Sequence, residues 1–295
     1  MPSLRHRALA RVIGQVRRSR EVDDPEQVRR DLLAGRPAVA PAPPRHLLRG
    51  CTVGRVEGYG FPVHSLTVAG ATPDRTVLYL HGGGYVGGID RFQWRYAAAL
   101  ARRLGVRVVL PDYPRAPEHT WRDAHPPLLA LFEQVAIESP RGVVLLGDSA
   151  GGGLALALAE QVVRRPGPQP TQLVLVSPWV DLTSSTPGTR EASARDPWLK
   201  FTKMDLYASW WAGQDDPSLP QVSPLFGDLK GLPPTLVFCG TRDTLWPQTV
   251  AFVREAARAG VPVTYHEERD LLHVYPILPV PEARTAMGQL VRWLR

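Results

Sequence analysis

The motif G-D-S-A-G at residues 147–151 constrains the fold of this 295-residue chain more than any other stretch. It follows an apolar run at residues 143–146 and precedes small and apolar residues over 152–164, a pattern that predicts a strand, a tight turn and a helix. Glycine on both sides removes side chains that would collide in such a turn. The turn would expose the hydroxyl of Ser149 and direct the amide of Ala150 at a reacting carbonyl oxygen. We therefore expect Ser149 to be a nucleophile; the alternative is a structural serine in a glycine-rich turn.

Apolar runs and helical patterns alternate along most of the chain. Strands without polar alternation are typical of a mostly parallel sheet covered by helices on both faces, so the predicted fold class is α/β. Strands are expected at 63–68, 77–80, 106–110, 143–146, 173–176, 236–239 and 261–266, and helices at 92–104, 122–137, 150–164, 247–259 and 282–294.

The first 45 residues form a separate helical segment in this interpretation. Apolar residues at helical spacing over 4–16, opposed by arginines, predict a basic amphipathic helix that either packs on the protein, which we favour, or lies on a lipid surface. Asp24 and Pro25 signal a second helix that ends at Gly35, and four prolines within 36–44 indicate a stiff connector.

One long insertion, residues 181–232, interrupts the alternation between two predicted strands. Thr202 and Asp205 suggest a capping box at the start of a helix. Leu206, Tyr207, Trp210 and Trp211 follow at helical spacing. We expect a lid helix over the mouth of the site, whose aromatic residues either contact substrate or serve as packing.

A serine hydroxyl needs an adjacent base, usually a histidine oriented by a carboxylate. Asp243 follows the strand expected at 236–239, and His273 follows the last strand, so both fall at the sheet edge that carries Ser149. Their order along the chain is the one that the strand–turn–helix motif requires. We prefer these two residues over the rivals at the last strand, which are His266, Glu267 and Asp270.

A glycine run at Gly82, Gly83 and Gly84 comes directly after the strand expected at 77–80. Consecutive glycines let backbone amides turn toward the negative oxygen of a tetrahedral intermediate, and Ala150 would add a further amide. A phosphate-binding loop would need a Gly-Lys-Ser/Thr ending, which is absent here. His81 is expected to brace this loop by hydrogen bonding.

Composition narrows the class of protein further. The formal net charge is +7, and nearly all of the positive charge is arginine. Outside the N-terminal segment the basic residues are scattered along the chain, whereas a nucleic-acid-binding protein has them clustered on one face. No apolar run reaches about 18 residues, and the N-terminus lacks the apolar core of a secretory signal. Cys51 and Cys239 do not form a disulfide framework. We expect a cytoplasmic protein without a nucleic-acid partner or stable membrane insertion.

Several motifs, in this order, resemble the hormone-sensitive-lipase family of α/β-hydrolases, in its bacterial carboxylesterase branch. They are H-G-G-G at 81–84, D-Y-P-R-A-P-E-H at 112–119, G-D-S-A-G-G at 147–152 and S-P-W-V-D-L at 177–182, with the Asp243 and His273 segments. The resemblance covers about residues 50 to 295. The G-T-R-D at 240–243 is further similar to monoterpene lactone hydrolases and acetyl-hydrolases. Two departures are Pro114-Arg115 for Arg-Leu and Tyr275 for Phe.

The resemblance implies an α/β-hydrolase fold with a helical cap, made of residues 1–45 and an insertion around 185–215 in a catalytic domain over 46–295. Ser149 would be the nucleophile, His273 the base and Asp243 the acid. Gly83, Gly84 and Ala150 would form the oxyanion hole, with Gly82 shaping its loop. Substrate-contact candidates are Tyr85, Trp179, Tyr207, Trp210 and Trp211.

The expected function is hydrolysis of short- to medium-chain acyl esters, without metal or cofactor. The alternatives are a lactone hydrolase, a deacetylase of natural products and a non-catalytic ligand receptor. The expected partner is a small-molecule ester, and a homodimer is an open alternative.

Overall fold

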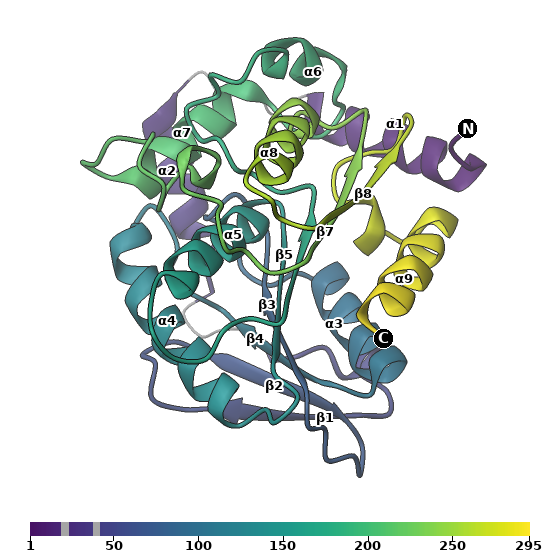
Figure 1. Ribbon diagram of the computed structural model, residues 1–295. Helices are drawn as coiled ribbons and strands as arrows, with labels where there is room; N and C mark the ends of the chain where they lie inside the picture. The colour runs from purple at the N-terminus through teal and green to yellow at the C-terminus, as the bar shows by residue number, and fades with distance from the viewer. Residues whose placement is uncertain (19–23, 38–41) are drawn as a thin grey trace.

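The structure, a computed structural model, describes residues 1–18, 24–37 and 42–295, and an eight-stranded sheet forms its centre (Figure 1). The strand order is β1-β2-β4-β3-β5-β6-β7-β8. β1 and β2 are antiparallel to each other, β2 is antiparallel to β4, and the other neighbours are parallel. The strands are β1 (Cys51–Val56), β2 (Val63–Val68), β3 (Thr76–Leu80), β4 (Arg107–Pro111), β5 (Val143–Asp148), β6 (Gln172–Val176), β7 (Thr235–Gly240) and β8 (Val263–Glu268).

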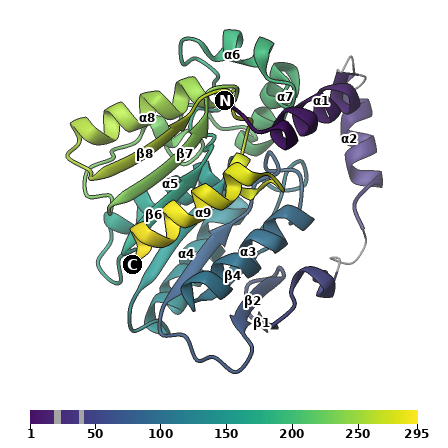
Figure 2. The same ribbon diagram turned by 90° about the vertical axis from the view of Figure 1, so that its right-hand side faces the viewer.

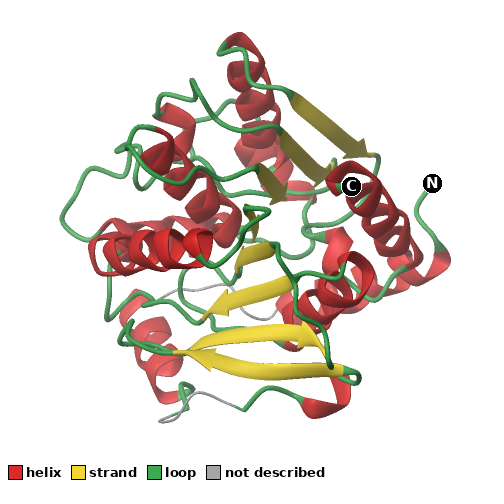
Figure 3. Ribbon diagram, turned by 60° about the horizontal axis from the view of Figure 1, so that its bottom comes forward, coloured by secondary structure: helices red, strands yellow, loops and turns green. Residues whose placement is uncertain are grey.

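Helices cover both faces of this sheet (Figures 2 and 3). α3 (Arg91–Leu104) and α9 (Pro281–Leu294) pack on one face, and α4 (Trp121–Ile137), α5 (Ala150–Val163) and α8 (Trp246–Arg258) on the other. Alternate strand residues face opposite layers, because side chains alternate along a strand: Leu78 joins the α5 side and Val77 the α3 side. The predicted α/β class is confirmed.

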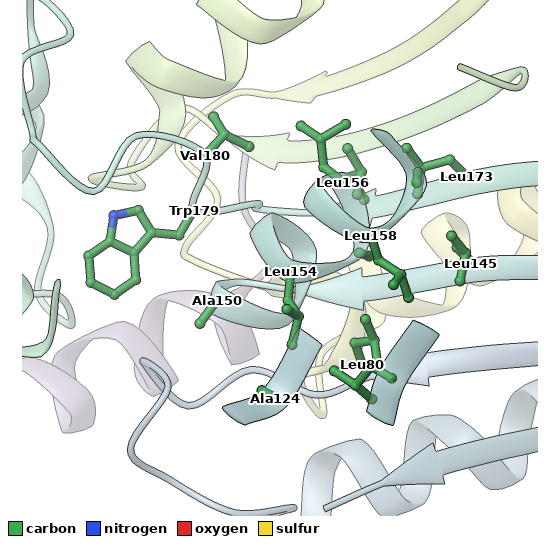
Figure 4. Close-up of a cluster of buried hydrophobic side chains, with 14 of the residues drawn as sticks. Leu80, Ala124, Leu145, Ala150, Leu154, Leu156, Leu158, Leu173, Trp179 and Val180 are labelled. Carbon is green, nitrogen blue, oxygen red and sulfur yellow. The ribbon is translucent and has the colours of Figure 1, made fainter. Parts of the chain in front are cut away.

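Leucines line the buried side of α5, which follows the G-D-S-A-G turn. Figure 4 shows them beside Leu80, Leu145 and Leu173 of three neighbouring strands. Small and apolar residues nearly all round α5 allow this helix to be buried between the sheet and α4, so the turn at its start is anchored to the core.

The N-terminal segment folds into the two predicted helices, α1 (Leu4–Arg18) and α2 (Pro25–Ala34). Asp24 caps α2 by accepting a hydrogen bond from the Glu26 amide, as the sequence predicts. In α1, His6 and Ala10 are buried, so this helix packs on the protein. The connector expected at 36–44 lies partly outside the described residues, at 38–41.

The insertion holds α6 (Thr189–Arg195) and α7 (Phe201–Ala212), which lie at the same end of the molecule as α1 and α2 (Figure 2). The predicted capping box of α7 is wrong. The helix begins two residues earlier than this box requires, after Lys200, and no side chain among the described residues caps it; Asp205 instead accepts a hydrogen bond from Ser184. Short 3-10 turns are η1 (Arg45–Leu47), η2 (Pro224–Phe226) and η3 (Tyr275–Ile277).

Among the described residues, none of the helices is both long and apolar enough to span a membrane.

Candidate active site

Ser149 occupies the turn between β5 and α5 in a strained conformation, with φ 54° and ψ −124°. Such a positive φ is uncommon for a residue other than glycine. The two flanking glycines explain how the turn closes: a Cβ on Gly147 would overlap the carbonyl of Gly151, and one on Gly151 would overlap the carbonyl of Leu80. The Ser149 amide donates to the Val176 carbonyl of β6, at 2.9 Å, which fixes the turn to the sheet.

The structure brings Ser149, His273 and Asp243 together from three separate loops. His273 Nε2 lies 2.9 Å from Ser149 Oγ, and His273 Nδ1 lies 2.9 Å from Asp243 Oδ2. Asp243 also accepts the Leu245 amide at 2.9 Å, so its carboxylate is held in place. All three side chains are nearly removed from solvent. This arrangement has the form of a hydroxyl, a base and an orienting acid in line.

The rival candidates lie elsewhere. His266 is on β8, stacked on Phe238 with ring centroids 5.0 Å apart. Glu267 accepts a hydrogen bond from the Trp246 indole at 2.8 Å. The amide of Asp270 donates to the Thr241 hydroxyl at the exposed end of the same strand. None of the three is bonded to Ser149 or His273 in the part of the chain that the structure describes.

The glycine loop after β3 lies against the Ser149 turn. Gly83 has φ 125° and Gly84 φ 64°, values that glycine adopts without strain. The Gly82 amide donates to Asp148 Oδ1 at 3.0 Å, so Gly82 anchors the loop. His81 braces it as well, with Nδ1 2.7 Å from the Gly82 carbonyl oxygen. Ala150 is the first residue of α5, where backbone amides lack partners within the helix.

Comparison with known proteins decides the family. The model of the alpha/beta hydrolase fold family matches residues 77–277, about two thirds of the chain. The chain belongs to this family. It is 36% identical over 228 residues to an acetyl-hydrolase of Streptomyces hygroscopicus, covering 75% of each chain. It is 30% identical over 230 residues to an esterase of Acinetobacter venetianus, covering 76% of each.

Solved structures with a similar fold support the same family. A crystal structure of an esterase from the bacterial hormone-sensitive lipase family superposes with a TM-score of 0.82 at 29% identity, covering 100% of this chain and 99% of that one. A crystal structure of a Staphylococcus aureus protein has a TM-score of 0.86 at 23% identity, covering 92% of this chain and 93% of that one, which shows the shared fold. This α/β-hydrolase is therefore an esterase of the hormone-sensitive-lipase branch, as the motifs predict.

A pocket of about 360 Å³ opens onto Ser149 and His273 in this esterase. Two of the predicted substrate-contact residues, Trp179 and Tyr207, line it. Tyr85, Trp210 and Trp211 do not. Tyr85 and Trp211 are fully buried and stack on each other with ring centroids 4.2 Å apart, which makes them packing residues between the glycine loop and the cap.

The sequence did not reveal the role of Asp148, which connects the glycine loop to the Ser149 turn. Its buried carboxylate accepts hydrogen bonds from the Tyr79 hydroxyl, the Gly82 amide and Gln93 Nε2. It thereby ties the glycine loop to the Ser149 turn. Burial raises the pKa of Asp148 against the effect of these donors. The signal in the sequence was a single acidic residue at the end of an otherwise apolar strand.

A second missed residue, Asp196, links the insertion to the acid loop. Its buried carboxylate accepts hydrogen bonds from the amides of Thr244, next to Asp243, and Trp198. The Trp198 ring meets the His273 ring edge to face, with centroids 5.7 Å apart. Burial and the nearby charge of Asp243 raise the pKa of Asp196. No local pattern distinguishes Asp196 from a surface carboxylate.

The electrostatics around His273 suit a base that gains a proton. Burial lowers the pKa of His273, but the charge and hydrogen bond of Asp243, helped by Asp196 and Asp148, outweigh it, so that the pKa lies above its ordinary value. The imidazolium that would form on proton transfer is therefore stabilised by three carboxylates.

Proposed function

We propose that this esterase is a serine carboxylesterase that hydrolyses short- to medium-chain acyl esters through a covalent acyl-enzyme. One observation carries the proposal: the continuous contact from Ser149 Oγ through the His273 ring to Asp243, with 2.9 Å at each step. A buried hydroxyl, imidazole and carboxylate at these distances form a nucleophile with its base and orienting acid.

In the first half of the proposed reaction, Ser149 Oγ attacks the ester carbonyl while its proton passes to His273 Nε2. The bond to the alcohol then breaks as His273 returns that proton to the leaving oxygen, so an acyl-serine remains. Water repeats the sequence: it loses a proton to His273, attacks the acyl carbonyl and releases the acid and free Ser149. Asp243 holds the ring and stabilises its charged form.

The developing negative oxygen would be held by the amides of Gly83, Gly84 and Ala150. In the part of the chain that the structure describes, none of these three amides donates a hydrogen bond, whereas the Gly82 amide donates to Asp148. Preorganised amides of this kind need no rearrangement at the moment of reaction, which is why they stabilise the transition state well.

The pocket supports the proposed substrate size. At about 360 Å³ it lies near the lower end of the range for small-molecule sites, and apolar side chains such as Phe92, Met204 and Ile277 contribute to its lining. We propose that residues 1–45 and the insertion around 185–215 act as a cap on a catalytic domain over 46–295. The name of the Streptomyces relative suggests acetyl esters, the shortest members of this class.

The test is hydrolysis of p-nitrophenyl acetate, butyrate, octanoate and palmitate by the wild type and by Ser149→Ala. We expect kcat/KM to fall from the short to the long esters and turnover to drop by at least about 10⁴-fold in the variant. Circular dichroism of the variant checks that it is folded. Retained turnover in Ser149→Ala would contradict the proposed nucleophile, and a preference for palmitate would contradict the proposed chain length.

A further inference from the structure

The segment that carries His273 is held at both neighbouring amides. The Leu272 amide donates to His6 Nε2 at 3.1 Å, and the Val274 amide donates to Ser177 Oγ at 3.0 Å. Val274 has φ 48° and ψ 34°, a left-handed conformation that a β-branched residue adopts only under strain. A strained segment needs external contacts to keep its shape, and these two hydrogen bonds supply them.

His6 reaches this segment from the other end of the chain, 266 positions away. Its side chain is 1% exposed. Since Nε2 accepts the Leu272 amide, the proton of the neutral ring is on Nδ1, which is buried without a hydrogen-bond partner among the described residues. The esterase mechanism proposed above assigns no role to this buried imidazole.

Helix α1 also supports His273 indirectly, because its apolar residues pack against Trp198. Ala10, Leu9 and Ile13 of α1 belong to a small apolar cluster with Leu272 and Trp198. Trp198 in turn meets the His273 ring edge to face. Therefore α1 supports the base both through the backbone before it and through a ring beside it.

We propose that His6 is a positioning residue for the catalytic base: its uncharged ring accepts the Leu272 amide and thereby fixes the segment that aligns His273 with Ser149 and Asp243. The inference rests on the proposed function. His6 is not among the residues that line the pocket, so it acts through His273 and not through substrate.

The proposed contact fails when His6 gains a proton, because both ring nitrogens then carry hydrogens and neither can accept the Leu272 amide. Glu282 of α9 and Arg242 of the loop after β7 are the charged groups that act on this ring. Burial lowers the pKa of His6 from its ordinary value, Glu282 opposes that effect and Arg242 adds to it. His6 is therefore neutral at pH 7 and becomes charged only in acid.

The test compares three substitutions at one position. The amide oxygen of a Gln is as many bonds from Cα as Nε2 of a His, whereas that of an Asn is as far as Nδ1. His6→Ala and His6→Asn should lower kcat on p-nitrophenyl acetate about five- to tenfold with KM nearly unchanged, the scale of one lost buried hydrogen bond. His6→Gln should restore kcat to within about twofold of wild type.

Ser3→Ala is the matched control. Ser3 anchors the same end of α1: its hydroxyl donates to Glu282 Oε2 at 3.0 Å and accepts the His6 backbone amide at 3.2 Å, and it does not bond Leu272. We expect its kcat to equal that of wild type. Far-UV circular dichroism and thermal unfolding of all variants show whether α1 and the fold persist.

The pH profile gives a readout that packing alone would not change. As pH falls below the His6 pKa, the ratio of the wild-type kcat/KM to that of His6→Gln should fall about five- to tenfold, because only the wild type loses its hydrogen-bond acceptor. The titration of His273 is common to both proteins and cancels in the ratio.

The outcomes separate the inference from the function on which it rests. Ser149-dependent turnover in wild type, with His6→Ala equal to wild type or His6→Gln as slow as His6→Ala, would overturn the role of His6 alone. A loss in Ser3→Ala as large as in His6→Ala would also overturn it, because the effect would then belong to helix anchoring. Absence of turnover by wild type on every ester would overturn the proposed function and this inference together.

Discussion

Gly83 shows how much of the proposed chemistry depends on one residue without a side chain. Its φ of 125° is in a region that L side chains rarely adopt, and a Cβ would lie 2.9 Å from the Gly87 carbonyl oxygen. Gly87 in turn donates its amide to the Gly83 carbonyl at 2.8 Å, so the loop is closed on itself. A methyl group at Gly83 would therefore rotate the amide proposed to hold the oxyanion.

We predict that Gly83→Ala lowers kcat on short esters by about 10²–10³-fold, the usual cost of losing one oxyanion donor. Gly70→Ala is the control, since Gly70 also has a positive φ, of 76°, but a Cβ there meets nothing within 4 Å. Steady-state kinetics of both variants check the prediction. Equal activity of Gly83→Ala and Gly70→Ala would show that the Gly83 amide is not an oxyanion donor.

At the scale of single residues, the sequence predicts which side chains react better than it predicts which residues contact them. Ser149, Asp243 and His273 could be chosen because each follows a strand, and strand ends of a parallel sheet meet at one edge. Asp148 and Asp196 could not be chosen, because their importance comes from buried contacts with Gly82 and Thr244 that no spacing reveals.

Helix α7 carries two aromatic residues whose sequence signals are alike and whose surroundings differ. Tyr207 lines the pocket and lies over the glycine loop, since a Cβ on Gly84 would come within 2.9 Å of its ring. Trp211, one turn later, is fully buried against Tyr85. Their helical spacing predicts that both residues belong to a lid helix, but only the folded structure shows which ring lines the pocket and which is buried in the core.

We predict that Trp211→Ala lowers the free energy of unfolding by about 3–5 kcal/mol, the range for removing a large buried aromatic side chain. Its KM on short esters should stay near the wild-type value at temperatures where it is folded. Tyr207→Ala should instead raise KM with a smaller change in stability. Denaturant unfolding and steady-state kinetics test the pair, and a reversed pattern would contradict this assignment of the two rings.

Helix α5 holds a buried carboxyl group away from the site. Glu160 is 2% exposed, and among the described residues neither carboxyl oxygen has a hydrogen-bond partner. Arg164 Nη2 lies 3.7 Å away at the surface. Burial raises the pKa of Glu160 to about 9; the charge of Arg164 lowers this pKa, and the charge of Asp228 raises it. The folded protein therefore holds a proton here at neutral pH that the unfolded chain releases.

This proton makes stability fall as pH rises. Between the ordinary Glu pKa and about 9, unfolding releases one proton, so the free energy of unfolding declines by on the order of 1 kcal/mol per pH unit from this group. We predict that Glu160→Gln lacks this decline and gains on wild type from pH 6 to pH 8. Urea unfolding of both proteins across this window is the measurement, and parallel curves would mean that Glu160 is ionised in the fold.

At the scale of the whole molecule, the sheet and its two helical layers follow from patterns that the sequence displays. Buried parallel strands are continuous apolar runs, and each came within a few residues of its observed bounds. β1 was missed because this edge strand is partly exposed and contains Gly54 and Arg55, which weaken the strand pattern. α6 was missed because seven residues are too few to show helical periodicity.

Long-range contacts are what the sequence could not supply. The helices of the N-terminal segment were predicted, but not that α1 would meet the segment before His273, because the partners lie 266 positions apart. In the proposed site, the catalytic residues can therefore be predicted from motifs, whereas the residues that support them are identified only by contacts in the folded molecule.

The proposed mechanism requires Ser149 to become covalently modified, and intact-protein mass spectrometry after treatment with a serine-directed phosphonate tests that directly. We predict one adduct, located by peptide mapping on Ser149, absent from Ser149→Ala and formed far more slowly in His273→Ala. An adduct on another residue, or ester turnover by a wild type that resists labelling, would contradict the proposed acyl-enzyme mechanism.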